Sequence, residues 1–383
     1  MNSYHYRLKG EILCKIRRIT LLLKKTLAQF FRVTQQFLPQ AKSVFIIQKI
    51  NRLNREGVFM NKVLKFFIWL FGGFLLVVIV GITLFSLSFP KSKPPSDIKV
   101  ELTTERIERG KYLANHVTGC MDCHSPRDFS YYGGPVLQGK AGSGGDIFDI
   151  NLGVPGKLFP PNLTPFNMKK YTDGELIRAM IEGINKEGKA LFPLMPYPNF
   201  AHLSKEDIYS IVAYIRTLPS VDNTVEAGSL DFPMNLIVKT IPQPVVLNGS
   251  FDKTNSVAYG KYLVTVASCA DCHTPMEKGT PIPGKDFAGG FTATFPKFTV
   301  TAANITPDTE TGIGSWTKET FIARFKLYSD SSYTPAKLDD GAFNTIMPWL
   351  FYSGMTEEDL GAMYDYLRTL KPIKNQITRF SSK

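Results

Sequence analysis

Residues 120–126 read CMDCHSP, and residues 269–275 read CADCHTP. Each stretch follows a GKYL tetrapeptide, at residues 110–113 and 260–263. C-x-x-C-H is the attachment signature of a c-type haem, because two thiols one helical turn apart can each bond a vinyl group of the porphyrin. The adjacent imidazole is then placed to ligate the iron. The sequence therefore predicts two covalently bound haems c. The residues that would hold them are Cys120, Cys123, His124, Cys269, Cys272 and His273.

Three other interpretations of the two motifs are weaker. A C-x-x-C pair can be a thioredoxin-like dithiol, but no βαβ pattern surrounds either copy. Two pairs can share a structural zinc, but a histidine directly after each second cysteine is not the spacing of a zinc site. A chance match would not bring the same upstream tetrapeptide and a following Ser/Thr-Pro twice.

The second half of the chain repeats the first in the same order. NLTP at 162–165 answers to NITP at 304–307, MPY at 195–197 to MPW at 347–349, and YIRTL at 214–218 to YLRTL at 366–370. We predict a tandem duplication. The predicted segments are 1–59 (basic N-terminal segment), 60–90 (transmembrane anchor), 91–103 (tether), 104–219 (first haem domain), 220–255 (connector), 256–375 (second haem domain) and 376–383 (tail).

Capping patterns predict the helices of both repeats. TDGE at 172–175, SKED at 204–207 and TEED at 356–359 each place a hydroxyl or acidic residue where a helix begins. After the second of these, the apolar residues recur at i, i+3, i+4 and i+7, which is one face of a helix. Residues 125–170 are rich in Gly and Pro and are expected to form long loops. The predicted fold class is mostly α, two tandem helical domains with long loops behind one transmembrane helix.

The second axial ligand of each iron separates an electron carrier from an enzyme. The second repeat contains His273 as its only histidine, so its haem cannot be bis-histidine within the chain. Methionine is the remaining donor, and Met/His ligation favours electron transfer. Met195 and Met347, each in a Met-Pro-aromatic triplet, are the predicted distal ligands. In the first repeat His202 is the one rival ligand, and His116 is expected to be a surface or loop residue.

Charge excludes a nucleic-acid binder. The formal charge of +12 is concentrated in residues 1–59, which hold twelve Lys or Arg against two Glu. From residue 95 onward the chain has 29 basic and 31 acidic residues, so no basic footprint remains.

Residues 66–89 contain no charge and are long enough, at about 1.5 Å per residue, to cross a bilayer of about 30 Å. A cleaved signal peptide is the alternative, but this apolar run is too long and no A-x-A-like site follows it. We predict an uncleaved single-pass anchor in the bacterial inner membrane, followed by a flexible tether. Because c-type haems are ligated outside the cytoplasm, the haem domains are expected on the periplasmic side.

The first 59 residues allow two interpretations. They could form an amphipathic cytoplasmic segment on anionic lipid. Alternatively they are not natively translated and Met60 is the natural start, because Met60 opens a well-formed basic region before the apolar run. The second interpretation also removes Cys14 and leaves four cysteines, all assigned to haem.

With these motifs the chain resembles the multi-haem cytochrome c subunits of membrane-bound periplasmic dehydrogenases, such as those for alcohols and gluconate. The resemblance runs over residues 105–373. It rests on NITPD at 304–308, GIGSWT at 312–317, the Met-Pro at 347–348 and DFPMNL at 231–236. It implies class I-like cytochrome c domains. Those subunits usually hold three haem domains and often a C-terminal anchor, whereas this chain shows two domains and an N-terminal anchor.

The predicted function is a membrane-anchored dihaem cytochrome c, an electron carrier and not an enzyme. It would transfer electrons outside the cytoplasm between a dehydrogenase or quinol-side donor and a terminal acceptor. Its expected partners are redox proteins, a dehydrogenase or an oxidase, together with the membrane. A dihaem peroxidase and a c-type subunit of a terminal oxidase are the alternatives.

Overall fold

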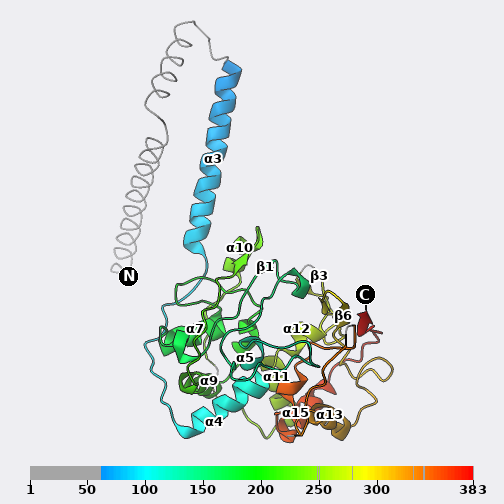
Figure 1. The fold of residues 1–383 in the computed structure, drawn as a ribbon. Coiled ribbons are helices and arrows are strands. Elements are labelled where there is room, and N and C mark those ends of the chain that lie inside the picture. The colour runs from blue at the N-terminus through cyan, green and yellow to red at the C-terminus, as the bar shows by residue number, and fades with distance from the viewer. Residues whose placement is uncertain are drawn as a thin grey trace. The chain divides into compact units, whose positions relative to one another are not determined.

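The computed structural model describes residues 62–247, 249, 251–277, 279–330, 332–339 and 341–382. The chain divides into two compact units, Met1–Thr83 and Leu84–Lys383 (Figure 1). Both interpretations of the basic segment 1–59 concern residues outside the described ranges.

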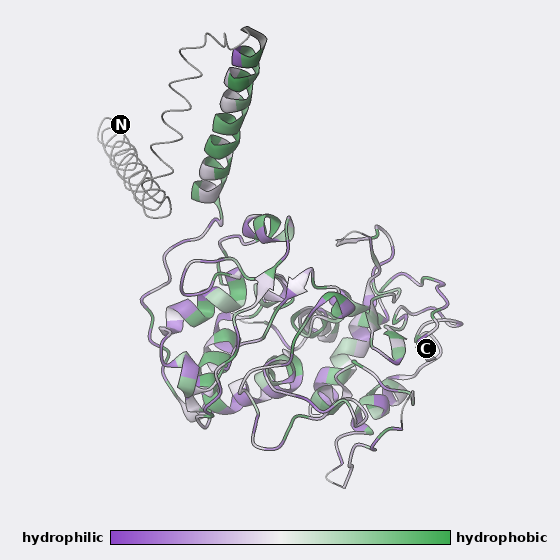
Figure 2. Ribbon diagram, turned by 45° about the horizontal axis from the view of Figure 1, so that its top comes forward, coloured by the Kyte–Doolittle hydropathy of each residue, from purple (hydrophilic) through white to green (hydrophobic). Residues whose placement is uncertain are grey.

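A long apolar helix, α3, covers Lys62–Ser88. Its side chains from Leu64 onward are nearly all exposed, and Figure 2 shows hydrophobic residues along most of its length. By length and composition, Leu64–Ser88 could cross a membrane. The helix ends two residues before Pro90, in keeping with the bias of a proline against helical backbone in the residue before it. The helix predicted for this part of the chain is confirmed.

The segment after α3 is extended, as a tether would be, but it is packed. The backbone N–H of Val100 donates to Asp173 Oδ2 at 2.8 Å, and the Val100 side chain is buried. Arg178 Nη1 donates to the carbonyl of Lys93 at 3.5 Å. Both partners belong to helix α7 (Asp173–Glu182). The expectation of a flexible spacer is therefore wrong at Lys93 and Val100, whose backbone groups have hydrogen-bond partners on α7.

The first half of the larger unit is helical around one crossing. Helix α4 packs against α9 at Gly110, where an added Cβ would lie 1.8 Å from the carbonyl oxygen of Ser210. Only glycine permits this approach, so the glycine of the first GKYL has a packing reason. The helices of this half are α4 (Thr104–Tyr112), the π-helix η1 (Leu113–Val117), α5 (Cys120–Cys123), α6 (Pro165–Met168), α7, α8 (Tyr197–Phe200) and α9 (Lys205–Thr217).

The second half repeats that crossing. Helix α11 packs against α15 at Gly260, where an added Cβ would lie 1.8 Å from the carbonyl oxygen of Ala362. Figure 1 shows α11, α13 and α15 together in this half. Its helices are α11 (Ser256–Val266), α12 (Cys269–His273), α13 (Lys318–Lys326), α14 (Trp349–Tyr352) and α15 (Glu357–Leu367).

The predicted caps are present. Thr172 and Glu175 form a capping box at the start of α7. Ser204 caps α9 and Thr356 caps α15, each through a hydroxyl that accepts the backbone N–H of the residue three positions on. The apolar face predicted for α9 is buried, with Ile208 fully enclosed. Local pattern therefore places the helices that frame both sites.

The strands are short and antiparallel, and no long sheet was expected. Three of them form a sheet in the order β5-β6-β7, with Phe298 opposite Ser382. The C-terminal residues thus end as a strand on β6. The strands are β1 (Gly156–Lys157), β2 (Ser229–Leu230), β3 (Met276–Glu277), β4 (Thr280–Pro281), β5 (Thr292–Thr294), β6 (Phe298–Thr301) and β7 (Phe380–Ser382). The remaining short helices are η2 (Ile150–Leu152), α10 (Met234–Ile237) and η3 (Val238–Thr240).

The two halves meet through reciprocal hydrogen bonds. The hydroxyl of Tyr112 donates to Asp359 Oδ2 at 2.6 Å and accepts the backbone N–H of Thr356 at 3.1 Å. The hydroxyl of Tyr262, at the same place in the second GKYL, donates to Asp207 Oδ2 and accepts the backbone N–H of Ser204 at 3.4 Å. Each half therefore supplies a tyrosine hydroxyl that hydrogen-bonds the first turn of the last helix in the other half, α15 or α9.

Candidate haem-attachment sites

Each C-x-x-C-H motif forms a short helix entered through a left-handed residue. Gly119 precedes α5 with φ 64°, and Ser268 precedes α12 with φ 58°. Glycine adopts this conformation at no steric cost, whereas serine is strained there. The Ser268 hydroxyl is also buried and has no hydrogen-bond partner among the described residues. The second site thus keeps the same backbone path at a conformational cost.

The first motif opens into a cavity of about 220 Å³. Its lining brings together Cys120, Cys123, His124 and Met195. Met195 lies 71 residues after His124 in the sequence, yet both side chains face the same space. Most of the remaining lining is apolar. The first set of predicted site residues is therefore assembled in one place.

The second motif opens into a cavity of about 480 Å³. Cys269, Cys272, His273 and Met347 all line it. Trp316 lines this cavity and Tyr171 lines the first one, at corresponding positions of the repeat. The second predicted set is assembled in the same way as the first.

The orientation of each histidine suits an iron ligand. His124 Nδ1 lies 2.7 Å from the carbonyl oxygen of Pro161, and His273 Nδ1 lies 2.7 Å from that of Ala303. A carbonyl only accepts, so Nδ1 carries the proton and Nε2 keeps its lone pair. Burial lowers the pKa of both imidazoles, which favours the neutral form that binds a metal. A carbonyl on the outer nitrogen also fixes the ring.

The loop that carries this carbonyl is fixed by the Asn-x-Thr-Pro repeat, whose structural role the sequence did not reveal. Asn162 Oδ1 accepts the backbone N–H of Thr164 at 2.8 Å, and its amide donates to Val221 O at 2.9 Å. Asn304 does the same with Thr306 at 3.0 Å and Ile373 O at 2.7 Å. The repeated NLTP and NITP motifs were the sequence signal for this loop. Each motif begins one residue after the carbonyl that contacts the histidine, at Pro161 or Ala303.

The two methionines sit in matching turns. The backbone N–H of Tyr197 donates to Met195 O at 2.7 Å, and that of Trp349 donates to Met347 O at 2.7 Å. The intervening prolines start α8 and α14 with φ −77° and −78°. Proline fixes the backbone, so each thioether is held on the cavity wall.

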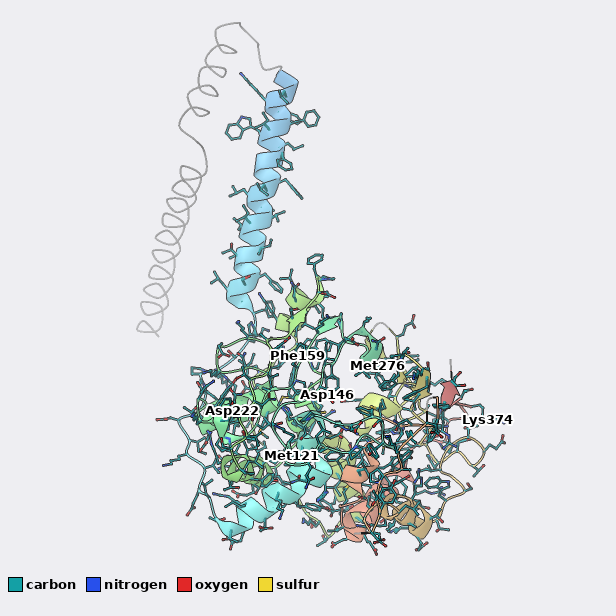
Figure 3. All side chains as sticks on the ribbon, in the orientation of Figure 1. Met121, Asp146, Phe159, Asp222, Met276 and Lys374 are labelled. Atoms are coloured by element: carbon teal, nitrogen blue, oxygen red, sulfur yellow. The ribbon has the colours of Figure 1, made fainter. Side chains whose placement is uncertain are left out.

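Other methionines take the places expected of packing residues. Met180 and Met363 lie on helices and are buried, although both also line a cavity wall. Met276 is half exposed, near the edge of the second half in Figure 3, whereas Met121 lies in the interior. Met355 is fully buried at the place where the first repeat has Leu203.

The two remaining described histidines are not in the first cavity lining. His202 is absent from it, so the structure does not bring this rival ligand to the site. The expectation that His116 is a surface or loop residue is wrong. It lies in η1, half-buried, with Nδ1 2.9 Å from the carbonyl oxygen of Phe351 in α14. Burial lowers its pKa. His116 is an interface residue between the halves.

The thiols are unlike those of a redox dithiol. Burial raises the pKa of Cys123 and of Cys269 to about 12, and it also raises that of Cys120. Reactive dithiols sit in electropositive surroundings that lower the pKa instead. Within the described part of the chain, no three His, Cys, Asp or Glu side chains converge as a metal cluster would require. Cavity, thiols, imidazole and thioether together fit a haem.

The two sites adjoin each other. Asn199, four residues after Met195, donates from its amide to Asp271 Oδ2 at 3.0 Å, and Asp271 lies between the two cysteines of the second motif. Conversely, Phe351 of α14 packs against the buried cluster of Ala114, Met121 and Leu218 in the first half. The helix after Met195 thus contacts the attachment helix of the second half, and α14, the helix after Met347, contacts η1, just before the first attachment helix.

Comparison with known proteins agrees with this geometry. Residues 257–371 match the family model for cytochrome c. The chain is 26% identical over 285 residues to the cytochrome c subunit of alcohol dehydrogenase (quinone) from Gluconacetobacter polyoxogenes, covering 70% of this chain and 56% of that protein. It is 26% identical over 283 residues to the gluconate 2-dehydrogenase cytochrome c subunit of Pantoea cypripedii, covering 69% and 59%. It is 29% identical over 252 residues to a dihaem c-type cytochrome of Cereibacter sphaeroides, covering 61% and 78%.

The chain therefore matches little more than half the length of these dehydrogenase subunits. Its second half contains a cytochrome c domain, and its homologues are dehydrogenase cytochrome c subunits and a dihaem cytochrome c. The resemblance inferred from the motifs is confirmed.

Proposed function

We propose that the protein, whose second half contains a cytochrome c domain, is a membrane-anchored dihaem electron carrier. The observation that carries this proposal is the repeated constellation: two thiols, a carbonyl-bound imidazole and a Met-Pro thioether line each of two cavities. The first half lies outside the family match, so the tandem arrangement and the second haem rest on this repetition.

The residues have distinct tasks. Cys120 and Cys123 attach the first haem, and Cys269 and Cys272 attach the second. His124 and His273 would bind the iron through Nε2, and Met195 and Met347 would supply the second protein ligand. The haem supplies the one-electron chemistry, while the protein supplies binding, orientation and exclusion of water. Tyr171 and Trp316, which line the two cavities, would hydrogen-bond a propionate.

A methionine available beside the histidine at each site favours a carrier over an enzyme. A peroxidase needs one iron with an open or displaceable ligand, and the matching Met-Pro turns at both sites argue against that. The contacts of α8 with the second attachment helix and of α14 with η1 suit electron passage from one site to the other.

The membrane and the partners complete the proposal. Helix α3 would anchor the chain once in the inner membrane, with residues 91–383 on the periplasmic side where haem c is ligated. The names of the relatives point to a dehydrogenase as electron donor. A quinol-side donor is the alternative to the dehydrogenase, and a terminal acceptor would receive the electrons in either case.

The test is a count of haems on the full chain isolated from membranes. We expect two covalent haems by intact mass and by haem absorbance per protein. Cys269→Ala with Cys272→Ala should leave one haem, as should Cys120→Ala with Cys123→Ala. Finding no covalent haem, or rapid carbon monoxide binding by the reduced unmodified protein, would overturn the carrier proposal.

A further inference from the structure

The two cavities differ in charge. Among the described residues that line the first cavity, none is Lys, Arg, Asp or Glu. The lining of the second cavity includes Arg324, Arg379 and Glu310. Glu310 is paired with Lys374 at 2.5 Å, so its carboxylate is already matched. The second cavity is left with two cationic side chains that no acid of its own lining neutralises.

Arg324 is held at the cavity wall without a carboxylate partner. It lies on α13, half-buried, with its guanidinium carbon 4.1 Å from the ring centroid of Trp349. Its Nη1 donates to the hydroxyl of Tyr328 at 2.6 Å. None of the described carboxylates is within ion-pair distance of it. Most of its five N–H donors are therefore left for another acceptor.

Arg379 completes the pair from the C-terminal segment. Its carbonyl accepts the backbone N–H of Thr301 at 3.0 Å, next to the pairing of β6 with β7. Its exposed side chain lines the cavity and forms no ion pair within the described part of the chain. The sheet thus brings a cation from the end of the chain to the haem site.

A residue from the first half closes this part of the second cavity. Tyr132 lines it, and its hydroxyl lies 3.3 Å from the hydroxyl of Tyr328. The backbone N–H of Tyr132 donates to Ala336 O at 2.9 Å, and that of Gly133 donates to Asn344 Oδ1 at 3.0 Å. The loop around Tyr132 is therefore hydrogen-bonded to the second half. The Tyr132 hydroxyl lies beside the Tyr328 hydroxyl, which in turn accepts a hydrogen bond from Arg324.

We propose that Arg324 and Arg379 bind the propionate carboxylates of the haem in the second cavity, and that Tyr132 positions Arg324 through Tyr328. This inference rests on the proposed function. A carboxylate at the wall of a cavity is stabilised by positively charged hydrogen-bond donors. Arginine suits it best, because its guanidinium can donate two parallel N–H groups to one carboxylate. The first cavity offers only neutral donors, such as Tyr171 and Asn185.

The consequence is a difference in potential between the haems. A positive charge near an iron centre disfavours the oxidised, more positive state. Arg324 and Arg379 should therefore raise the potential of the second haem alone. Tyr132 would make that potential depend on contact between the two halves.

The experiment is a redox titration of the full dihaem chain and its variants. Arg324→Gln and Arg379→Gln should each lower the reduced-to-oxidised ratio of the second haem at a fixed potential by roughly threefold to tenfold. Tenfold corresponds to 59 mV for a one-electron couple. Arg324→Lys should retain most of the potential, because the charge stays. Tyr132→Phe should shift the second haem in the same direction by less.

Controls separate this inference from packing and from the proposed function. Arg106→Gln, an exposed arginine paired with Glu206, should move neither haem. The second haem is identified as the one whose titration changes in Met347→Ala. Fewer than two haems in the unmodified chain would sink the proposed function. Two haems whose potentials are unchanged in both glutamine variants, or shifted equally, would overturn the propionate assignment.

Discussion

Arg109 and Tyr259 occupy the same place in the two repeats, one residue before the glycine at which the helices cross. Arg109 Nε donates to Asp207 Oδ1 at 2.8 Å. Tyr259 is buried with its hydroxyl lacking a hydrogen-bond partner among the described residues, and Asp359, the counterpart of Asp207, has no cation. Helix crossings, histidine carbonyls and methionine turns are the same in both halves. The charges around them are not.

This comparison separates two kinds of requirement. Attachment and ligation demand fixed geometry, so both halves repeat the left-handed entry, the Asn-x-Thr loop and the Met-Pro turn. The charged residues around a site change its electrostatic environment without changing its backbone geometry, so they can differ between the two halves. The family match covers residues 257–371, and the first repeat lacks the GIGSWT segment that this range contains.

The largest expected effect comes from removing one thioether at a time. Met347→Ala should open the second haem to carbon monoxide and lower its potential, because Met/His ligation raises the potential. Met195→Ala should do the same at the first haem only. If the methionines merely pack, each variant costs about 2–5 kcal/mol of stability and leaves the haem spectrum unaltered. Carbon monoxide binding with redox titration distinguishes these results, and a response at both haems would break the equivalence of the halves.

The carboxylates at the interface should respond unequally. Asp207→Asn leaves Arg109 without its anion, and because Arg109 is 26% exposed we expect a loss of about 2–3 kcal/mol of unfolding free energy. Asp359→Asn weakens only the hydrogen bond from Tyr112 and should cost about 1–2 kcal/mol. Denaturant unfolding of the dihaem chain measures both. Equal losses would show that the charge on Arg109 is compensated elsewhere.

Ser268→Gly tests the strained entry to the second motif. Glycine relieves the left-handed conformation and removes a buried hydroxyl without a partner, so the variant should be more stable by about 1 kcal/mol. Thermal unfolding is the measurement. Gly119→Ser is the matched reverse change and should destabilise by a similar amount. A Ser268→Gly variant no more stable than the parent would mean that the hydroxyl has a role in the loaded site.

The smallest effect is expected at His116, whose counterpart in the second repeat is Val266, and it concerns the pH dependence of stability. Burial lowers the pKa of His116 below its ordinary value, so the unfolded chain binds the proton more readily than the folded one. Stability is then lost as the pH falls below about 6.5. The free energy of unfolding of His116→Val should therefore fall less between pH 7 and pH 5 than that of the parent, by a difference below about 1 kcal/mol. Unfolding at pH 7 and pH 5 measures it, and an unchanged pH slope would contradict the assignment.

The sequence predicted what depends on local pattern and on repetition. Cap motifs located α7, α9 and α15. The duplicated spacing singled out Met195 and Met347, and each lines a cavity together with the histidine of its motif. Contacts over long separations were not predictable. Tyr112 meets Asp359 across 247 residues, and nothing near either residue marks the pairing. The hydrogen bonds of Lys93 and Val100 to α7 were not predictable for the same reason, since a Pro- and Lys-rich segment gives no local sign of its partner.

The reciprocal bonds of Tyr112 and Tyr262 have a bearing on ancestry. When residue i of one half meets residue j of the other, and j meets i in return, the contact has the pattern of a two-fold symmetric homodimer. A single-repeat ancestor would already have presented both the tyrosine and the capped helix that receives it. Duplication and fusion of its gene would then have joined two subunits that already fitted. After fusion each copy could change alone, and positions such as Arg109 and Tyr259 record that later divergence.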